Sequence, residues 1–189
     1  MTYSRRDWIN LPNLITLARI VVVPVFMFIL LAHPSKADAL RWLAVVLFVA
    51  AIATDGVDGA IARKRGLVTN LGKILDPIAD KALIGGAMIG LSLIGELSWT
   101  ITVLILIREV GITIYRMVVI RKRVIAASAG GKLKTILQGI LFGFLLSPLD
   151  FFWTWLVPLE NLLLLVTVAV TLWTGATYLR DARSANQES

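Results

Sequence analysis

The chain has 189 residues, of which 58% are hydrophobic and 16% charged, and its mean hydropathy is +0.82. Soluble globular domains average about 45–50% apolar and about 25% charged residues, so this composition argues against a soluble enzyme, a disordered tail or a nucleic-acid-binding module. The chain lacks cysteine, which excludes disulfides and thiolate zinc sites, and it has one histidine. Its net charge of +7 comes from bases that lie between apolar runs, which favours an anionic membrane surface over nucleic acid as their partner.

Six apolar runs are long enough to cross a bilayer, which takes about 20 residues. They predict an all-α integral membrane fold with six transmembrane helices, in chain order Leu11–Ala32, Leu40–Ala62, Leu71–Ile94, Trp99–Ile120, Leu133–Pro148 and Leu159–Leu179. Residues Met1–Asn10 are expected to form a short interfacial helix. The first run could instead belong to a cleaved signal peptide, but Asp7 and the extension of the basic region to Arg19 argue against cleavage. We expect one polytopic domain over residues 1–189.

The loops between these runs alternate in charge. Basic residues precede the first run and follow the second, fourth and sixth, whereas the other loops hold mainly acids. This bias predicts that both termini and both basic loops face the cytoplasm, in a multi-pass protein of the cell (plasma) membrane. The aromatic residues 151–153 and 155 are expected to form a belt at the outer interface. Asp150 and Glu160 are interpreted as solvated loop acids.

Four aspartates stand out because ionisable groups inside membrane spans cost about 2.5–3.5 kcal/mol each. Asp55 and Asp58 are three residues apart in the second span, and Asp76 and Asp80 are four apart in the third. Each pair therefore lies on one helix face, and the short link between the spans makes the two helices antiparallel neighbours. Four converging carboxylates repel one another unless a cation lies among them, and all-oxygen ligands favour Mg²⁺, Mn²⁺ or Ca²⁺. Pairing with nearby lysines and arginines is the alternative.

Small residues accompany these acids. Gly59 and Ala62 follow the first pair, Gly72 precedes the second, and Arg63 lies one turn beyond Gly59, where it could meet a phosphate. The stretch as a whole is D-x2-D-G-x2-A-R-x8-G-x3-D-x3-D over residues 55–80. This pattern resembles, without a departure, the signature of the CDP-alcohol phosphotransferases, a family with a six-helix membrane fold. Gly85, Gly86 and Gly90 are interpreted as ordinary helix-packing positions.

The resemblance implies a metal-dependent enzyme that displaces CMP from a CDP-activated lipid with an alcohol. It implies Asp55, Asp58 and Asp76 as ligands of Mg²⁺ or Mn²⁺, with Asp80 as the general base and a possible further ligand. By the same resemblance, the residues near the CDP group are Asn13, Thr16, Arg19, Asp58, Gly59, Ala62, Arg63 and Gly72. The alternative for the first three is an interfacial helix start with a snorkelling arginine.

A second cluster bears on the acceptor. Arg108 and Arg116 lie eight residues apart in the fourth span, and Lys132, Lys134 and Thr135 open the fifth. Basic side chains on adjacent helices suit an acceptor that carries its own phosphate. The run Arg108-Glu109…Arg116…Ser128…Gly131-Lys132-x-Lys134-Thr135-x2-Gln138 resembles the phosphatidylglycerophosphate synthase branch of the family. A buried ion pair of Arg108 with Glu109, and interfacial anchoring by Lys132 and Lys134, are the alternatives.

Together these features predict an enzyme that uses CDP-diacylglycerol and sn-glycerol 3-phosphate to make phosphatidylglycerophosphate and CMP. The lipid tails are expected to enter from the bilayer and the head groups from the cytoplasm. The resemblance alone suggests a homodimer. The rival hypotheses are another acceptor (inositol phosphate, serine or another phosphatidyl alcohol), a divalent-cation transporter, and an inactive lipid-binding relative.

Overall fold

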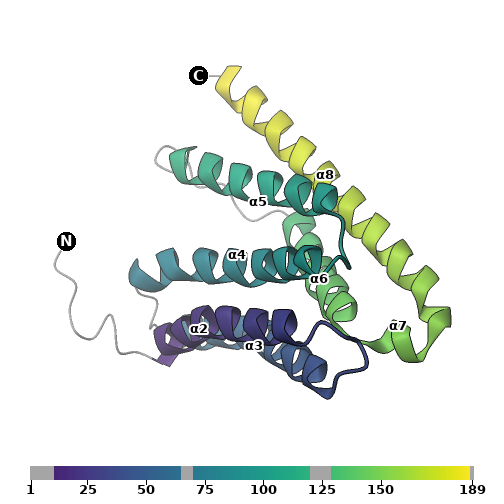
Figure 1. The fold of residues 1–189 in the computed structure, drawn as a ribbon. Coiled ribbons are helices and arrows are strands. Elements are labelled where there is room, and N and C mark those ends of the chain that lie inside the picture. The colour runs from purple at the N-terminus through teal and green to yellow at the C-terminus, as the bar shows by residue number, and fades with distance from the viewer. Residues whose placement is uncertain (1–10, 65–69, 120–128, 188–189) are drawn as a thin grey trace.

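A computed structural model describes residues 11–64, 70–119 and 129–187 of the chain, and all regular structure in these ranges is helical (Figure 1). The long helices are α2 (Leu11–Ala32), α3 (Ala39–Lys64), α4 (Asn70–Leu93), α5 (Trp99–Val119), α6 (Ala129–Leu146) and α8 (Val157–Gln187). Two short elements, α7 (Leu149–Phe152) and the 3₁₀-helix η1 (Thr154–Leu156), connect α6 to α8. The predicted interfacial helix at residues 1–10 lies outside the described residues.

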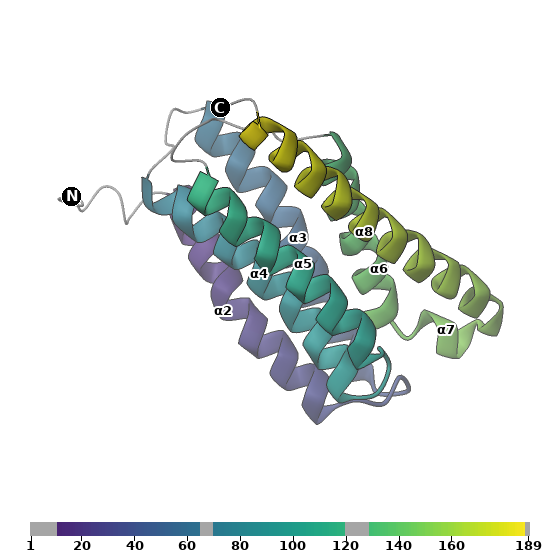
Figure 2. The same ribbon diagram turned by 90° about the horizontal axis from the view of Figure 1, so that it is seen from above.

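Helices α2 to α5 run alternately in opposite directions (Figure 2), and α8, which contacts α5 and α6, lies slanted relative to α4 and α5 (Figure 1). Helix α2 packs against both α3 and α4, so the first three long helices form one closely packed group. Helix α6 joins this group to α8, because it contacts α3 and α4 as well as α8. The second and third predicted spans are therefore neighbours in the same packed unit.

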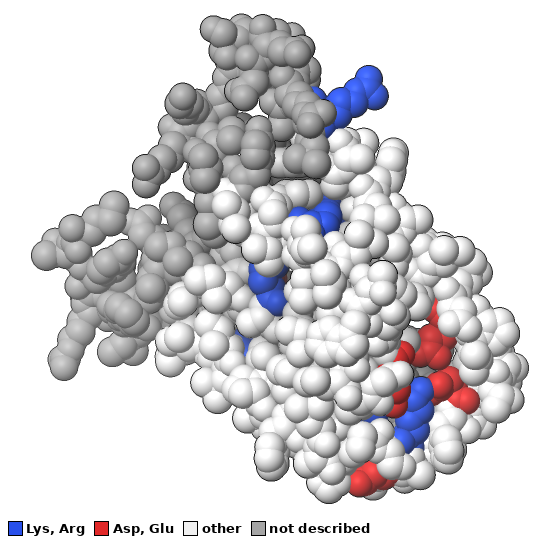
Figure 3. Space-filling view, turned by 45° about the horizontal axis from the view of Figure 1, so that its top comes forward, with Lys and Arg blue, Asp and Glu red and all other residues white. Residues whose placement is uncertain are grey.

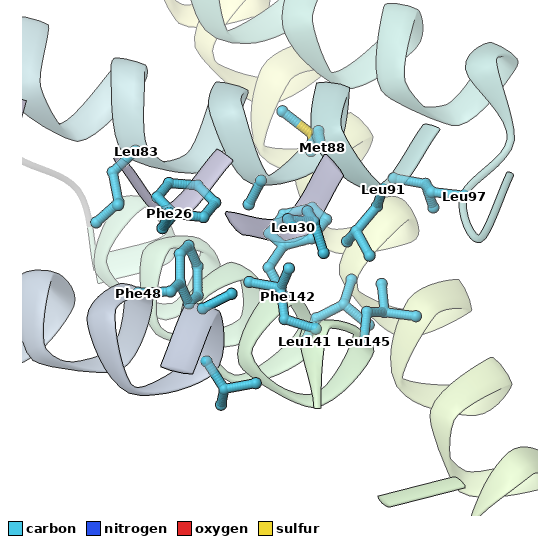
Figure 4. Close-up of a cluster of buried hydrophobic side chains, with 14 of the residues drawn as sticks. Phe26, Leu30, Phe48, Leu83, Met88, Leu91, Leu97, Leu141, Phe142 and Leu145 are labelled. Atoms are coloured by element: carbon cyan, nitrogen blue, oxygen red, sulfur yellow. The ribbon is translucent and has the colours of Figure 1, made fainter. Parts of the chain in front are cut away.

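The core of this unit is apolar and closely packed. Phe26 of α2 and Phe48 of α3 meet edge to face, with ring centroids 5.8 Å apart, among leucines of α4 and α6 (Figure 4). A Cβ added at Gly86 would lie 3.0 Å from Val23, and one added at Gly90 would lie 2.8 Å from Leu30. These two glycines therefore allow α4 to approach α2 closely, which confirms their interpretation as packing positions.

The outward faces of the bundle are also apolar. Phe28, Val46, Ile107, Leu165 and Trp173 are all exposed, and they come from α2, α3, α5 and α8. Within the described residues, Asn13–Ala32 and Thr154–Tyr178 are long and apolar enough to cross a membrane, and Ala39–Thr54 and Leu133–Leu146 are shorter apolar stretches. The all-α prediction is thus confirmed for the described chain, and its apolar helices are consistent with a membrane protein. Six spans with cytoplasmic termini stay a prediction.

The helix bounds follow the predicted apolar runs closely, with two differences. Helix α6 begins at Ala129 rather than Leu133, and α8 continues to Gln187 rather than ending at Leu179. Both extensions consist of small, charged and other polar residues, which lower the apolar signal but do not prevent a helix. Helices α2 and α4 also continue through Pro24 and Pro77.

Charged side chains gather at the end of the bundle where the α2–α3 loop, the α4–α5 loop and α7 lie (Figure 3). Arg41 is fully buried there and forms a two-bonded pair with Glu96, and Lys36 pairs with Asp150 at 2.5 Å. Glu160 is buried close by. We call these five residues the loop-end cluster. The prediction that Asp150 and Glu160 are solvated loop acids is wrong, because Asp150 lies in α7 and is paired with Lys36, and Glu160 is buried in the first turn of α8.

Candidate functional site

Two of the signature aspartates lie on α4, facing the start of α2. Asp76 accepts a hydrogen bond of 2.9 Å from the Thr16 hydroxyl, and Asp80 lies 3.4 Å from the Arg19 guanidinium. Thr16 and Arg19 are almost fully buried, as is Asn13 one turn earlier. The α2 residues are three positions apart and the two aspartates of α4 are four apart, so each set lies on one face of its helix. These two faces meet. The structure therefore joins part of the predicted CDP-binding face to part of the predicted metal site.

The remaining signature residues are only partly described. The last turns of α3 contain Asp55, Asp58, Gly59, Ala62 and Arg63, whose backbone is helical but whose side chains lie outside the described part. Gly72 is buried in the first turn of α4. The convergence of all four aspartates therefore stays a prediction.

Glu109 of α5 is the centre of an ionic network, and its pairs with two lysines were not expected from the sequence. Its side chain is 5% exposed, and its two oxygens lie 2.5 Å from Lys134 of α6 and 2.6 Å from Lys81 of α4. The Lys134 side chain is 8% exposed, whereas that of Lys81 is 37% exposed. One carboxylate thus holds two lysines from two other helices, and Lys81 directly follows Asp80 in the chain.

Arg108 also pairs with Glu109, but it connects this carboxylate to α8. Its guanidinium donates to Glu109 at 2.8 Å and to the Thr174 hydroxyl of α8 at 2.9 Å. A Cβ at Gly175 would lie 3.2 Å from the Arg108 side chain, so this glycine makes room for it. The alternative of an Arg108–Glu109 ion pair therefore matches the geometry. The side chains of Arg116 and Lys132, which were predicted beside it, lie outside the described part.

A cavity of about 110 Å³ opens between α3, α4, α5 and α6. Its volume is several times the ~10–15 Å³ that one water needs. The polar residues that line it are Asp80, Lys81, Glu109, Lys134, Thr135 and Gln138, and the apolar ones include Ile52, Leu83, Met88 and Leu106. Arg108 does not line it. The cavity therefore brings the predicted general base together with two of the predicted acceptor residues.

The donor set at the start of α4 suits a hard divalent cation. Asp76 and Asp80 are half-buried carboxylates one turn apart, and oxygen ligands of this kind are those that Mg²⁺ and Mn²⁺ prefer. A group of three candidate ligand side chains does not occur within the described part of the chain, and the side chains of Asp55 and Asp58 are outside it.

Lys81 and Gln138 also line the cavity; Gln138 belongs to the run that resembles the phosphatidylglycerophosphate synthase branch, but the sequence gives neither residue an individual role. A signal existed for both: Lys81 follows the last signature aspartate, and Gln138 lies one helical turn after Lys134 on α6. What the sequence could not supply is the partner of Lys81, since Glu109 is 28 residues away.

Comparison with known proteins places this arrangement in a family. The chain is 45% identical over 176 residues to a Mycobacterium tuberculosis protein named "Probable phosphatidylglycerophosphate synthase", a match that covers 92% of this chain and 81% of that relative. It is 38% identical to a Bacillus subtilis protein named CDP-diacylglycerol–glycerol-3-phosphate 3-phosphatidyltransferase, covering 89% of this chain and 93% of the relative. A Rickettsia typhi protein of the same name is 36% identical, covering 93% and 98%. Residues 9–173 match the CDP-alcohol phosphatidyltransferase family profile, and the chain therefore belongs to that family.

Proposed function

We propose that the protein transfers the phosphatidyl group of CDP-diacylglycerol to sn-glycerol 3-phosphate, giving phosphatidylglycerophosphate and CMP. The observation that carries this proposal is the similarity, over about nine-tenths of the chain, to relatives named for this reaction. The unbroken D-x2-D-G-x2-A-R-x8-G-x3-D-x3-D pattern and the cavity beside Asp80, which Lys134 and Thr135 also line, support it.

In this proposal Asp80 acts as the general base. The acceptor hydroxyl gives its proton to an Asp80 carboxylate oxygen, and the hydroxyl oxygen forms a bond to the phosphorus of the phosphatidyl group. The bond between that phosphorus and the bridging oxygen of the pyrophosphate breaks, and CMP leaves with the electron pair. The position of Asp80 on the cavity wall, with a half-exposed side chain, supports this role.

The nucleotide and the metal are assigned to the same end of the bundle. Asn13, Thr16, Arg19 and Gly72, together with Asp58, Gly59, Ala62 and Arg63, would bind the CDP group. Asp55, Asp58, Asp76 and Asp80 would hold Mg²⁺ or Mn²⁺. When bound, the cation neutralises charge on the pyrophosphate and its leaving group.

The acceptor phosphate is assigned to the basic side of the cavity. Lys134 and Thr135 of α6 line it; Lys132 lies on the same helix, and Arg116 lies on α5, which also borders the cavity. Lys81 adds a cation that is partly exposed and close to Asp80. Arg108 contributes indirectly, through its pair with Glu109. Phosphate oxygens accept such charge-assisted hydrogen bonds well.

The setting of the enzyme is also a proposal. We assign the protein to the cell membrane as a multi-pass protein with six spans, with both termini and the site facing the cytoplasm. The charge alternation of the loops and the exposed apolar faces of the helices support this topology. Family resemblance supports a homodimer.

The test is CMP release by the purified protein in detergent with CDP-diacylglycerol and Mg²⁺ or Mn²⁺. Parallel reactions contain sn-glycerol 3-phosphate, inositol 1-phosphate or serine. Release with glycerol 3-phosphate alone, abolished by EDTA, is the expected result. Release with a different acceptor would refute the acceptor assignment and leave the aspartate chemistry intact.

Asp80→Asn is expected to abolish CMP release while metal-dependent nucleotide binding survives. Asp38→Asn makes the same chemical change in the loop between α2 and α3, at the other end of the bundle, and serves as the matched control. Loss of nucleotide binding in Asp80→Asn would instead make Asp80 primarily a metal ligand.

A further inference from the structure

The amide of Gln138 is a buried donor without a partner. The residue is 2% exposed, and its Nε2 atom has no hydrogen-bond partner among the described residues. A buried donor left unpaired carries the full desolvation penalty of that group, so nearly all buried polar atoms are satisfied in folded proteins. This amide therefore needs an explanation that lies beyond the folded chain itself.

The place of Gln138 supplies one. Among the buried side-chain atoms that have no hydrogen bond in the described chain, Nε2 of Gln138 is the one that belongs to a cavity-lining residue. The unpaired hydroxyls of Thr167 and Thr171 lie on α8, away from the cavity. The cavity has room for a small polar molecule, and a hydroxyl or phosphate oxygen in it would accept this hydrogen bond.

The other polar groups of the cavity indicate which oxygen of the bound substrate accepts the hydrogen bond from Gln138. Lys81 and Lys134, held by Glu109, present the positive charge that a phosphate requires. Asp80 is the carboxylate for the attacking hydroxyl. A phosphorylated three-carbon polyol has one further oxygen, the hydroxyl on its middle carbon, which can accept a hydrogen bond from a neutral donor. An amide one turn from Lys134 on α6 is such a donor.

We infer that Gln138 determines acceptor specificity by donating a hydrogen bond from Nε2 to the middle hydroxyl of the phosphorylated polyol acceptor. The inference rests on the proposed function, because it names the contact by which the same site recognises its acceptor. It assigns a role to a residue that otherwise adds only an unsatisfied polar group to the interior.

The experiment compares two acceptors, sn-glycerol 3-phosphate and 3-hydroxypropyl phosphate, which lacks the middle hydroxyl. In the wild-type protein, kcat/KM is expected to be roughly 5- to 150-fold higher for glycerol 3-phosphate, the range that follows from leaving one buried donor unpaired. Gln138→Met is expected to bring the ratio of the two kcat/KM values close to one. Gln138→Leu, which removes the donor and supplies no acceptor in its place, gives the same result and replaces Gln138→Met if that variant does not fold.

Thr167→Val is the matched control, because it removes an unpaired buried hydroxyl outside the cavity. It is expected to keep the wild-type ratio. An equal loss of kcat/KM for both acceptors in the Gln138 variants would leave the ratio unchanged and overturn the inference while the proposed function stands. If the wild-type protein releases CMP with neither acceptor, the proposed function itself fails, and the inference fails with it.

Discussion

Replacing Glu109 by glutamine is expected to lower the free energy of unfolding by about 3–5 kcal/mol. The substitution removes the negative charge that lies 2.5 Å from Lys134 and 2.6 Å from Lys81, and the Lys134 side chain is only 8% exposed. Breaking a buried ion pair by removing one partner leaves an uncompensated charge in a poorly solvated place, which costs about this much. Lys81 adds less to the loss because it is 37% exposed.

A double substitution tests whether the loss of stability comes from the ion pair between Glu109 and Lys134. In Lys134→Met, Glu109 keeps Lys81 and Arg108 as partners, so the loss is expected to be smaller than in Glu109→Gln. In Glu109→Gln with Lys134→Met, both buried charges are removed, and a buried pair replaced by uncharged groups of similar size is often nearly neutral. The combined loss is therefore expected to fall below the sum of the two single losses by about 0.5–3 kcal/mol.

The assay is the midpoint of thermal unfolding of the purified protein in detergent. For a chain of this size about 1 kcal/mol corresponds to about 2–4 °C, so Glu109→Gln is expected to lower the midpoint by roughly 6–20 °C. Glu160→Gln is the matched control: burial and the nearby acids Asp150 and Glu96 disfavour the Glu160 charge and outweigh the attraction of Lys36, so losing that charge leaves the midpoint unchanged or higher. A Glu109→Gln shift no larger than that of the control would refute the reasoning.

Three further predictions concern stability, each measured by the same unfolding midpoint. The backbone N–H of Leu40 and the side chain of His33 lower the pKa of Asp38, so this carboxylate stabilises the fold above the ordinary carboxyl pKa and stops doing so as the pH falls through the lowered value. Asp38→Ala is therefore expected to lower the midpoint at neutral pH. A difference from the wild type that persisted in strong acid would contradict this. Gly86→Ala is expected to cost about 1–3 kcal/mol, because its Cβ would crowd α2 at 3.0 Å, whereas the control Gly85→Ala meets only an ordinary 3.5 Å contact; equal shifts would contradict the packing argument. Arg41→Met is expected to cost about 3–5 kcal/mol, since the carbonyls of Pro34 and Leu146 lose their donor and Glu96 keeps only its 4.0 Å pair with Lys36; an unchanged midpoint would show that the buried pair adds nothing.

Local patterns in the sequence predicted the helices well. An apolar run reports where a helix is buried or lipid-facing, so Leu11–Ala32 agrees with α2 at both ends. The same criterion is blind to polar helical turns, which explains the late start predicted for α6 and the early end predicted for α8. The short elements α7 and η1 follow Pro148 in an aromatic stretch. They have four and three residues, too few to give a periodic apolar pattern.

The spacing of acids predicted the candidate site only within single helices. Asp76 and Asp80 share a face because a helix turns every 3.6 residues, and no further information is needed. Their meeting with Thr16 and Arg19 depends on how α2 crosses α4, which the one-dimensional pattern does not contain. The lysine pairs of Glu109 and the burial of Glu160 likewise depend on helices and loops far apart in the chain.

The loop-end cluster has a mechanical consequence for the whole bundle. Arg41 donates to the carbonyl oxygens of Pro34 and Leu146 as well as to Glu96, so one guanidinium fastens the α2–α3 loop, the end of α6 and the α4–α5 loop to the start of α3. Helices tied at one end can separate mainly by splaying at the other, which is the end that carries Asp76 and Asp80. The loop-end cluster thus holds one end of the bundle together while the opposite end is freer to open. Amide hydrogen exchange should therefore be slowest in the turns around the cluster and fastest at the opposite ends of the same helices.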